Sequence, residues 1–443
     1  MTIGPNGRRP GGEPPGLAGA AAQRSAEYTG RYVVLLDQSD PQSGLEALRR
    51  SAGVASAERI RGAEPESAAE ALARPDTSVL FDELAVAVVE AQPDQRHALV
   101  TTAEAEPSII AAEPERVVYA ATITDAGQSL TGFFPAYRSD DAELERFTQA
   151  ELAAHLGPAW DESNATWGLQ AIRANASGMT GQGVKIAVLD TGVDTTHPDL
   201  AGCLDETASF VASEEVKDGH GHGTHCIGTV AGPARPRQGP RYGVAGGARV
   251  LAGKVLDNTG HGTDGNILAG MAWAVSRGVR AISMSLGGAV EPGELFPQTY
   301  ELAAQRALKR GTVIVAAAGN ESHRPRVVRP VGRPANCPSI LAVAALDKDL
   351  STAWFSCQAI NGQGGEIDIA APGVDVYSAK PGGQYQTLSG TSMATPHVAG
   401  VLALIAQAHP GASADELAKR LLSGAFPLSQ PAEDIGAGLL QAP

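Results

Sequence analysis

The chain has 443 residues, of which 43% are hydrophobic, with 52 glycines, 29 prolines and a formal net charge of −15. This length exceeds one ordinary hydrophobic core, so we expect two or three folded units. The chain contains no apolar run of about 18 residues, the minimum for a membrane-spanning helix, so we expect no membrane partner. The acidic balance argues against nucleic acid as a partner.

The charge divides the chain into two unlike parts. Residues 1–160 carry 13 arginines, no lysine and 24 acidic residues, a net of −11, whereas the remainder carries 21 basic and 25 acidic residues, a net of −4. Residues 1–28 are rich in glycine, proline and alanine, which predicts a disordered segment. Their apolar stretch is too short and weak for a clear export signal, so the sequence leaves both secretion and a cytoplasmic location open.

Residues 29–120 predict a small α+β domain. Strands are expected at 31–37, 78–91 and 115–120, helices at 43–53 and 93–101, and one weakly marked strand at either 56–61 or 108–110. This order predicts a β-α-β-β-α-β, ferredoxin-like unit, which by itself indicates no function. Residues 121–160 are interpreted as a connector with one helix at 140–156.

Residues 161–443 have a different rhythm, in which short apolar strands alternate with helices. Strands are expected at 184–190, 249–256, 280–286, 312–320, 339–346 and 367–373, and helices at 222–232, 264–277, 298–310, 391–408 and 413–423. Continuous Val, Ile and Ala strands between helices indicate a mostly parallel sheet with helices on both faces, an α/β fold. Sites in such sheets form at the carboxyl ends of the strands.

Four polar residues stand at such positions. Asp190 and Asn320 end predicted strands, whereas His222 and Ser392 open predicted helices. Each has an ordinary explanation when taken alone, because serine caps helices and Asp or Asn closes strands in turns. Together they supply an orienting carboxylate, an oxyanion donor, a general base and a nucleophile, which is the set that a serine hydroxyl needs for acyl transfer.

A metal site is the alternative for the histidines. His220, His222 and His225 are spaced by two and three residues, and metal ligands often occur at such spacings. Only Asp218 and Cys226 are near enough in the sequence to complete the ligand set. The metal interpretation is therefore the weaker one, and we expect no metal and no cofactor in the catalytic site.

The motifs around these residues resemble those of the subtilisin-like serine proteases. They read DTGVDTTHPDL around Asp190, GHGTHCIGT around His222, AAAGN ending at Asn320 and GTSMATPHVAG around Ser392, with SMSLGG at 283–288. The order Asp, His, Ser is that of subtilisin. The resemblance implies Asp190 as orienting acid, His222 as base and Ser392 as nucleophile. It also implies that Asn320 and the Ser392 backbone N–H form the oxyanion hole.

The resemblance also implies a cleft for an extended peptide between two strand edges. One edge is formed by Ser285, Leu286 and Gly287, and the opposite edge by 258–265, which includes Gly262. Gly332 falls at the base of the first specificity pocket and implies a large apolar residue before the scissile bond, while Glu321 at its rim adds tolerance for a basic side chain. Asp264 stands where relatives often place an aromatic lid.

Two departures from the resemblance concern metal and thiol chemistry. Asp199 matches a carboxylate that binds structural calcium in many relatives, but the loop at 232–243 has no Asn or Asp to join it, which argues against a calcium site there and leaves calcium dependence open. Cys226 matches the free cysteine of a thiol-sensitive branch. Cys337 and Cys357 are candidates for pairing that the sequence alone does not decide.

The resemblance implies that residues 29–120 are a propeptide that templates folding and then occupies the cleft as an inhibitor. We expect a serine endopeptidase, made as a self-inhibited zymogen, in which Ser392 cuts its own chain near Tyr119 or Ala120. A second cut near residue 160 is the alternative. Expected partners are a protein or peptide substrate and its own propeptide, with the chain as a monomer. Two other functions stay open, a specialised maturation protease for one peptide and a catalytically silent peptide-binding protein.

Overall fold

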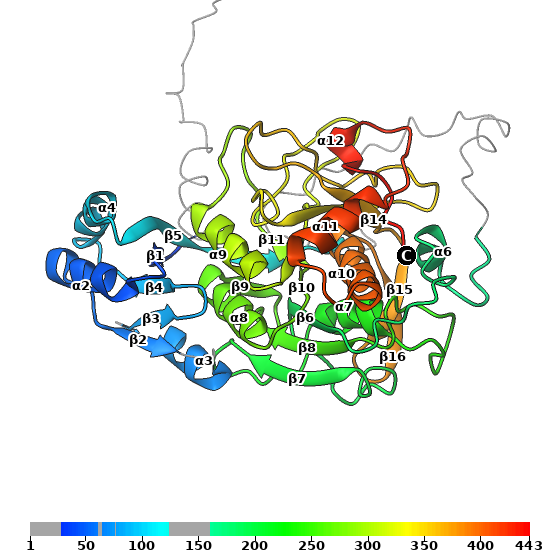
Figure 1. Ribbon diagram of the computed structural model, residues 1–443, viewed down its shortest axis with the longest axis horizontal. Coiled ribbons are helices and arrows are strands. Elements are labelled where there is room, and N and C mark those ends of the chain that lie inside the picture. Colours follow the sequence, from blue (N-terminus) through cyan, green and yellow to red (C-terminus); the bar gives the residue numbers. More distant parts are fainter. Residues whose placement is uncertain (1–27, 61–63, 76, 124–159) are drawn as a thin grey trace, which may run out of the picture.

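The computed structural model describes residues 28–60, 64–75, 77–123 and 160–443. A smaller N-terminal unit, blue to cyan in Figure 1, lies against a larger α/β unit. The predictions of disorder at 1–28 and of a helix at 140–156 concern residues that lie almost wholly outside the described ranges. Among the described residues, no helix combines the length and hydropathy that crossing a membrane requires.

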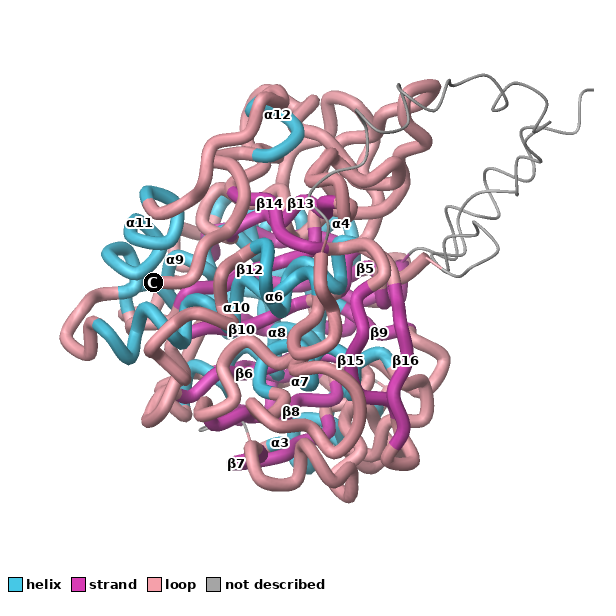
Figure 2. The backbone as a smooth tube through the Cα atoms, turned by 90° about the vertical axis from the view of Figure 1, so that its right-hand side faces the viewer, coloured by secondary structure: helices cyan, strands magenta, loops and turns pink. Residues whose placement is uncertain are grey.

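The larger unit is built on a seven-stranded parallel sheet in the order β14-β13-β12-β10-β6-β8-β7, which Figure 2 shows from top to bottom. Six of these strands are the apolar runs expected from the sequence, and they are almost entirely buried because helices cover both faces. The seventh, β7, is a polar edge strand that the sequence did not indicate. The bounds are β6 Lys185–Asp190, β7 Leu204–Ser209, β8 Arg249–Lys254, β10 Ala281–Met284, β12 Val313–Ala317, β13 Leu341–Leu346 and β14 Ile369–Pro372.

Two pairs of helices cover this sheet. α7 (His222–Ala231) and α10 (Thr391–Ala408) pack together on one face, and α8 (Asp264–Ser276) and α9 (Gln298–Lys309) lie on the face toward the N-terminal unit. The remaining elements of this unit are α6 Trp167–Ala171, β9 His261–Thr263, β11 Leu286–Gly287, β15 Val376–Lys380, β16 Gln384–Leu388, α11 Ala414–Ser423 and α12 Ala432–Ile435. The catalytic-site motifs thus begin α7 and α10 and end β6 and β12 on one side of the sheet.

The N-terminal unit has a sheet in the order β5-β1-β4-β3-β2, with α2 and α4 packed against each other. The expectation of one strand at 78–91 was wrong, because a turn with Ala85 at a φ of 45° divides it into β3 and β4. The weakly marked strand is β2, and α3, which was not expected, follows it. The bounds are β1 Tyr28–Leu36, α2 Pro41–Ala52, β2 Ala57–Ile60, α3 Pro65–Ala73, β3 Ser78–Phe81, β4 Val86–Glu90, α4 Arg96–Ala105 and β5 Ile109–Ala120.

Strand β5 connects the two units. Its first half pairs with β1, and the ladder shifts register next to Pro114, which has no N–H to donate. Beyond that point Arg116 still pairs with Tyr28 of β1, and from Val117 onward β5 runs antiparallel to β9 and then β11, between two edges of the larger unit. The chain's own segment therefore lies as a strand in the cleft.

Carboxylates on β5 cap the two helices on the facing side of the sheet. Glu113 accepts hydrogen bonds from the N–H groups of Gln298 (2.8 Å) and Thr299 (3.1 Å) at the start of α9, and from the Thr299 hydroxyl (2.6 Å). Glu115, fully buried, accepts the N–H of Gly265 at the start of α8 (2.9 Å). Acidic groups at helix N-termini satisfy free N–H groups and the helix dipole, so these contacts hold the two units together.

Candidate active site

Asp190 and His222 form a buried hydrogen-bonded pair. Asp190 ends β6, and its Oδ1 lies 2.6 Å from Nδ1 of His222 at the start of α7. Both side chains are 1% exposed. Burial lowers the pKa of His222, but the charge and hydrogen bond of Asp190 outweigh it and hold that pKa well above its ordinary value. The carboxylate thus fixes the orientation of the ring and makes it a stronger base, because it stabilises the imidazolium that forms when the ring accepts a proton.

The loop before His222 is fixed by Asp218. Its carboxylate accepts the N–H groups of Gly221 (2.7 Å) and Thr224 (2.8 Å) and the Thr224 hydroxyl (2.7 Å). Asp218 therefore caps the N-terminus of α7 and is not available as a metal ligand. His225 is also occupied, because its Nε2 lies 2.9 Å from the Val376 carbonyl oxygen and burial lowers its pKa to about 3.

The histidines do not assemble the alternative metal site. Within the described residues, the His, Cys, Asp and Glu side chains that bring ligand atoms within 4.8 Å of one another in a group of three are Asp190, His222 and Cys226. Neither His220 nor His225 joins them. Cys226 lies 3.9 Å from Nδ1 of His222, and burial raises the pKa of its thiol, so it stays protonated at neutral pH.

Ser392 lies in the first turn of α10 and is fully buried. Its Oγ donates to the Ser285 carbonyl (3.0 Å), while the Ser285 hydroxyl donates to the Ser392 carbonyl (2.8 Å). Nε2 of His222 has no hydrogen-bond partner in the described part of the chain, so the Ser392 hydroxyl is turned away from the base here. Gly390, which precedes the helix, has a φ of 153°, a backbone conformation open to glycine.

The side chain of Asn320 is held with its amide nitrogen near Gly390, the residue before α10. Its Oδ1 accepts the N–H (2.9 Å) and the hydroxyl (2.8 Å) of Thr391, which fixes the side-chain orientation. Its Nδ2 is buried without a partner among the described residues. A Cβ placed on Gly390 would stand 3.3 Å from this Nδ2 and 2.8 Å from the Ala121 carbonyl oxygen. The unpaired Nδ2 of Asn320 and the Ala121 carbonyl oxygen therefore both lie next to Gly390.

The chain's own peptide passes between the two expected edges. Ala120 pairs with Leu286 of β11 and donates its N–H to the Gly260 carbonyl (2.9 Å). Ala121 donates to the Ser285 carbonyl (3.5 Å), and Ile123 donates to the Ser389 carbonyl (2.9 Å). Gly287 and Gly262 pair further upstream, with Tyr119 and Val118 respectively.

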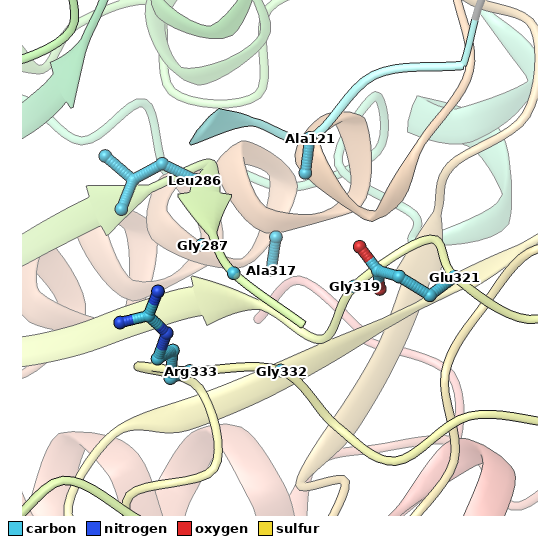
Figure 3. Close-up of a pocket in the computed structure, with 9 residues that line it drawn as sticks. Ala121, Leu286, Gly287, Ala317, Gly319, Glu321, Gly332 and Arg333 are labelled. Carbon is cyan, nitrogen blue, oxygen red and sulfur yellow. The ribbon is translucent and has the colours of Figure 1, made fainter. Parts of the chain in front are cut away.

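The pocket next to this segment holds Ala121 and is drawn in Figure 3. Its wall contains Gly332 and Glu321, the two positions expected from the sequence, and also Ala317, Gly319 and Arg333, which were not expected. Glu321 extends over Gly319 toward the space that the Ala121 side chain faces. The Cys357 thiol donates to the Glu321 carboxylate (3.2 Å), and burial raises the pKa of Glu321.

Gly332 has a packing role as well as a place in the pocket. A Cβ at this position would approach the Gly288 carbonyl oxygen to 2.8 Å, closer than real Cβ atoms tolerate without a shift. Asp264 is buried at the far end of the cleft, where its carboxylate accepts the Arg116 N–H (2.7 Å) and the Tyr300 hydroxyl (3.0 Å). Burial raises the pKa of Asp264 to about 6.

The residues around Asp199 do not fit a calcium ion. Its carboxylate accepts hydrogen bonds from the Arg237 N–H (2.9 Å) and from the hydroxyls of Tyr242 and Tyr385 (2.8 Å each). These neighbours are hydrogen-bond donors, whereas calcium requires six to eight oxygen ligands. Asp199 therefore anchors a tyrosine cluster. The four cysteines, including Cys337 and Cys357, are free buried thiols.

Some site residues could not have been found from the sequence. Thr391 belongs to the GTSMA motif, but its role in orienting Asn320 depends on a contact 71 residues away. Cys357 contacts the pocket residue Glu321 from a loop with no local signal, whereas Arg333 directly follows Gly332. Glu115 was visible only as an acid in the predicted strand 115–120, and Glu113 lay just before it, because a helix cap supplied from another unit leaves no mark in the helix itself.

Comparison with known proteins places this geometry in a family. The model of the Subtilase family matches residues 181–438, more than half of the chain. Subtilisin E of Bacillus subtilis (strain 168) is 42% identical over 264 residues, which cover 58% of this chain and 65% of that protein, so the alignment spans just under two thirds of subtilisin E. Subtilisin of Bacillus pumilus is 42% identical over 264 residues, which cover 58% of this chain and 90% of that protein.

The M-protease of Shouchella clausii (strain KSM-K16) is 38% identical over 311 residues, which cover 69% of this chain and 73% of that protein. The match to the family model covers the positions of Asp190, His222, Asn320 and Ser392. The chain belongs to the subtilase family.

Proposed function

We propose that this protein is a serine endopeptidase that is made as a self-inhibited zymogen and whose first substrate is its own chain. The observation that carries the proposal is the passage of residues 117–123 through the site, with the Ala121 carbonyl oxygen beside Gly390, where the free amide of Asn320 also lies. A bound strand aligned in this way presents one peptide bond to the serine. That bond joins Ala121 to Thr122, one residue beyond the site near Tyr119 or Ala120 expected from the sequence.

In the proposed mechanism, the Ser392 hydroxyl first rotates away from the Ser285 carbonyl toward His222. Its Oγ attacks the Ala121 carbonyl carbon while Nε2 of His222 takes the hydroxyl proton, and Asp190 stabilises the resulting imidazolium. The negative oxygen is met by Nδ2 of Asn320 and the Ser392 N–H.

The C–N bond to Thr122 then breaks as His222 returns the proton to the departing nitrogen. This leaves Ala121 as an ester on Ser392. A water molecule, deprotonated by the same imidazole, hydrolyses that ester and frees the carboxylate of Ala121.

Cleavage does not by itself remove the propeptide. The β9 and β11 ladders and the helix caps by Glu113 and Glu115 do not involve the Ala121–Thr122 bond, so they outlast its cleavage. Arg306 of α9 adds hydrogen bonds to the carbonyls of Leu36 (2.6 Å) and Leu84 in the N-terminal unit. Residues up to Ala121 therefore stay in the cleft as an inhibitor until they dissociate or are degraded.

For other substrates, the first pocket supports a large apolar side chain before the scissile bond, since Gly319 and Gly332 leave its wall open. The Glu321 carboxylate supports tolerance for a basic side chain. A peptide library with varied residues at this position would test both preferences.

A fluorophosphonate probe tests the activity itself. The processed wild type is expected to be labelled on Ser392 and to hydrolyse a peptide anilide, whereas Ser392→Ala is expected to do neither. Processed protein that takes no label would favour a catalytically silent peptide-binding protein. Labelled protein that cleaves one peptide of the library would favour a specialised maturation protease.

A further inference from the structure

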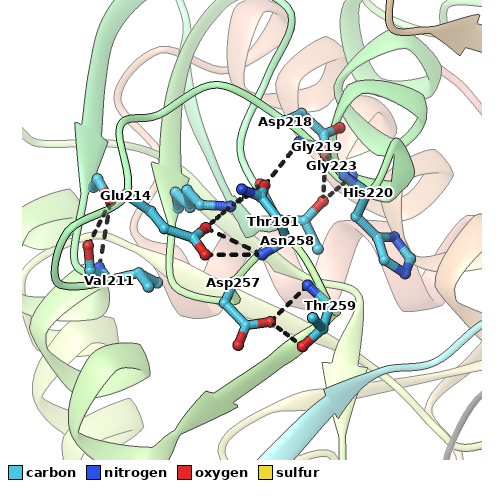
Figure 4. A network of polar contacts seen from close by, with 12 residues as sticks. Thr191, Val211, Glu214, Asp218, Gly219, His220, Gly223, Asp257, Asn258 and Thr259 are labelled. Atoms are coloured by element: carbon cyan, nitrogen blue, oxygen red, sulfur yellow. Dashed lines mark hydrogen bonds and ion pairs between the residues drawn. The ribbon is translucent and has the colours of Figure 1, made fainter.

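Lys254 is a fully buried lysine that the proposed mechanism does not use. It ends β8, and in the parallel ladder its Cα pairs with that of Asp190 on β6. Lysine is rarely buried completely unless its charge is paired, because desolvation of an ammonium is costly. Figure 4 shows the polar network to which it belongs.

The ammonium group is saturated by three acceptors from three separate segments. Nζ lies 2.6 Å from the Thr191 carbonyl oxygen, 3.1 Å from Oδ1 of Asn258 and 3.1 Å from Oε2 of Glu214. An ammonium has three N–H donors and no acceptor, so each donor has one partner. Glu214 balances the charge and also accepts the Asn258 N–H (3.1 Å).

Through Thr191 the ammonium reaches the acid–base pair. The Thr191 N–H donates to Oδ1 of Asp190 (2.8 Å), the same oxygen that lies 2.6 Å from His222. The Thr191 hydroxyl donates to Asp218 (2.9 Å) and accepts the Gly223 N–H (2.9 Å). The position of the Thr191 carbonyl therefore sets the turn that carries the catalytic acid and supports the loop that carries the base.

Through Asn258 the ammonium reaches the substrate edge. Asn258 lies in the turn before β9, and the Gly260 carbonyl of that turn accepts the Ala120 N–H (2.9 Å) from the bound strand. Oδ1 of Asn258 also accepts the N–H of Gly219 (2.8 Å), which belongs to the loop before His222. The side-chain oxygen of Asn258 thus contacts both the Lys254 ammonium and the loop before His222, while the backbone of Asn258 belongs to the turn of the substrate-binding edge.

We propose that Lys254 is a positioning residue that fixes the substrate-binding edge relative to the Asp190–His222 pair. The inference rests on the proposed peptidase function and adds to it a residue that touches neither substrate nor reacting atoms. A peptide that occupies the edge is then held in register with the catalytic groups, whereas a substrate too short to reach the edge gains nothing from this link.

The test compares two substrates on the processed enzyme, with active sites counted by a fluorophosphonate probe. The long substrate is the anilide of Val-Tyr-Ala-Ala, the sequence of residues 118–121, and the short substrate is an N-acetyl-alanine ester. The variant is Lys254→Met, which keeps the length of the side chain and removes its donors. The control is Lys185→Met, at the opposite end of β6, where the side chain is 45% exposed.

We expect Lys254→Met to lower kcat/KM for the long substrate by about tenfold or more, with a rise in KM and a fall in kcat, since small displacements of bound groups are costly in rate. The short substrate is expected to lose much less, so the ratio between the two falls, and Lys185→Met is expected to keep the wild-type ratio. A ratio in Lys254→Met equal to that of wild type would overturn the proposal, whether or not the melting temperature had fallen.

A second variant decides the matter if Lys254→Met fails to process or fold. Asn258→Ala removes the acceptor on the edge side and leaves the contact between Lys254 and Thr191. It is expected to lower the same ratio, chiefly through KM of the long substrate, and an unchanged ratio would again overturn the proposal. Wild-type protein that neither takes the probe nor hydrolyses the ester would instead show that the proposed peptidase function fails.

Discussion

Replacing Glu113 by alanine should weaken the hold of the propeptide on the mature enzyme without touching the catalytic groups. In the structure, the residue before α9, Pro297, offers no side-chain cap, and the Glu113 carboxylate supplies three hydrogen bonds to the first turn instead. Loss of a cap costs about 0.5–2 kcal/mol, and an anion at a helix N-terminus contributes about 0.3–1 kcal/mol more.

We therefore expect Glu113→Ala to weaken propeptide binding by about 1–2 kcal/mol, which corresponds to about 5- to 30-fold in the dissociation constant. The assay dilutes the self-processed complex and follows hydrolysis of a peptide anilide, and the concentration at which half of the sites are active reports the dissociation constant. Labelling with a fluorophosphonate probe provides the count of sites.

Glu104→Ala is the matched control, since Glu104 is an exposed glutamate on α4 of the same unit. The control should behave as wild type. If half of the Glu113→Ala sites became active at the same protein concentration as half of the wild-type sites, the view that this carboxylate caps α9 across the interface would be wrong.

Three further predictions concern the catalytic site and the tyrosine cluster. Asn320→Ala should lower kcat by about 10²–10³, the range measured for the equivalent donor in subtilisin itself, with little change in KM, and a loss under tenfold would exclude Asn320 as the oxyanion donor. Although burial lowers the pKa of His222, Asp190 raises it more, so kcat/KM should fall on acidification with a midpoint above the ordinary imidazole value of about 6.5, and Asp190→Asn should move that midpoint down. Asp199→Asn should lower the melting temperature by about 2–10 °C, because a neutral amide replaces the charged acceptor of the two tyrosine hydroxyls, and a chelator should have no such effect on wild type.

The sequence predicted the parallel sheet well because its buried strands are continuous Val, Ile and Ala runs with no other plausible structure. It missed β7, whose residues LDETAS are half polar because the strand lies at the sheet edge. The hairpin of β15 and β16 was also missed, since β15 buries Ser378 beside Val376 and Ala379, and β16 has no buried residue, so neither strand shows an apolar alternation. In the N-terminal unit, a turn of four residues inside an apolar stretch was too short to separate two strands by pattern alone.

The residues of the candidate site also divide into those that the sequence predicted and those that only the fold shows. Asp190, His222, Asn320 and Ser392 stand in local motifs whose glycines and turns are visible in the sequence. Residues that act through distant contacts carry no local sign. Lys254 falls inside the predicted strand 249–256 with no sign of a role, and only the fold shows that its ammonium lies buried between the catalytic turn and the substrate edge.

Cleavage of the chain by its own serine is the central claim, and intact mass spectrometry of the purified protein tests it directly. Wild type should yield a mature fragment that begins at Thr122, or one shortened further by a later cut near residue 160, together with a propeptide that ends at Ala121. Ser392→Ala, prepared in parallel, should remain a single chain of 443 residues. If wild type and Ser392→Ala both stay intact under the same conditions, or if both give the same fragments, Ser392 does not cut its own chain.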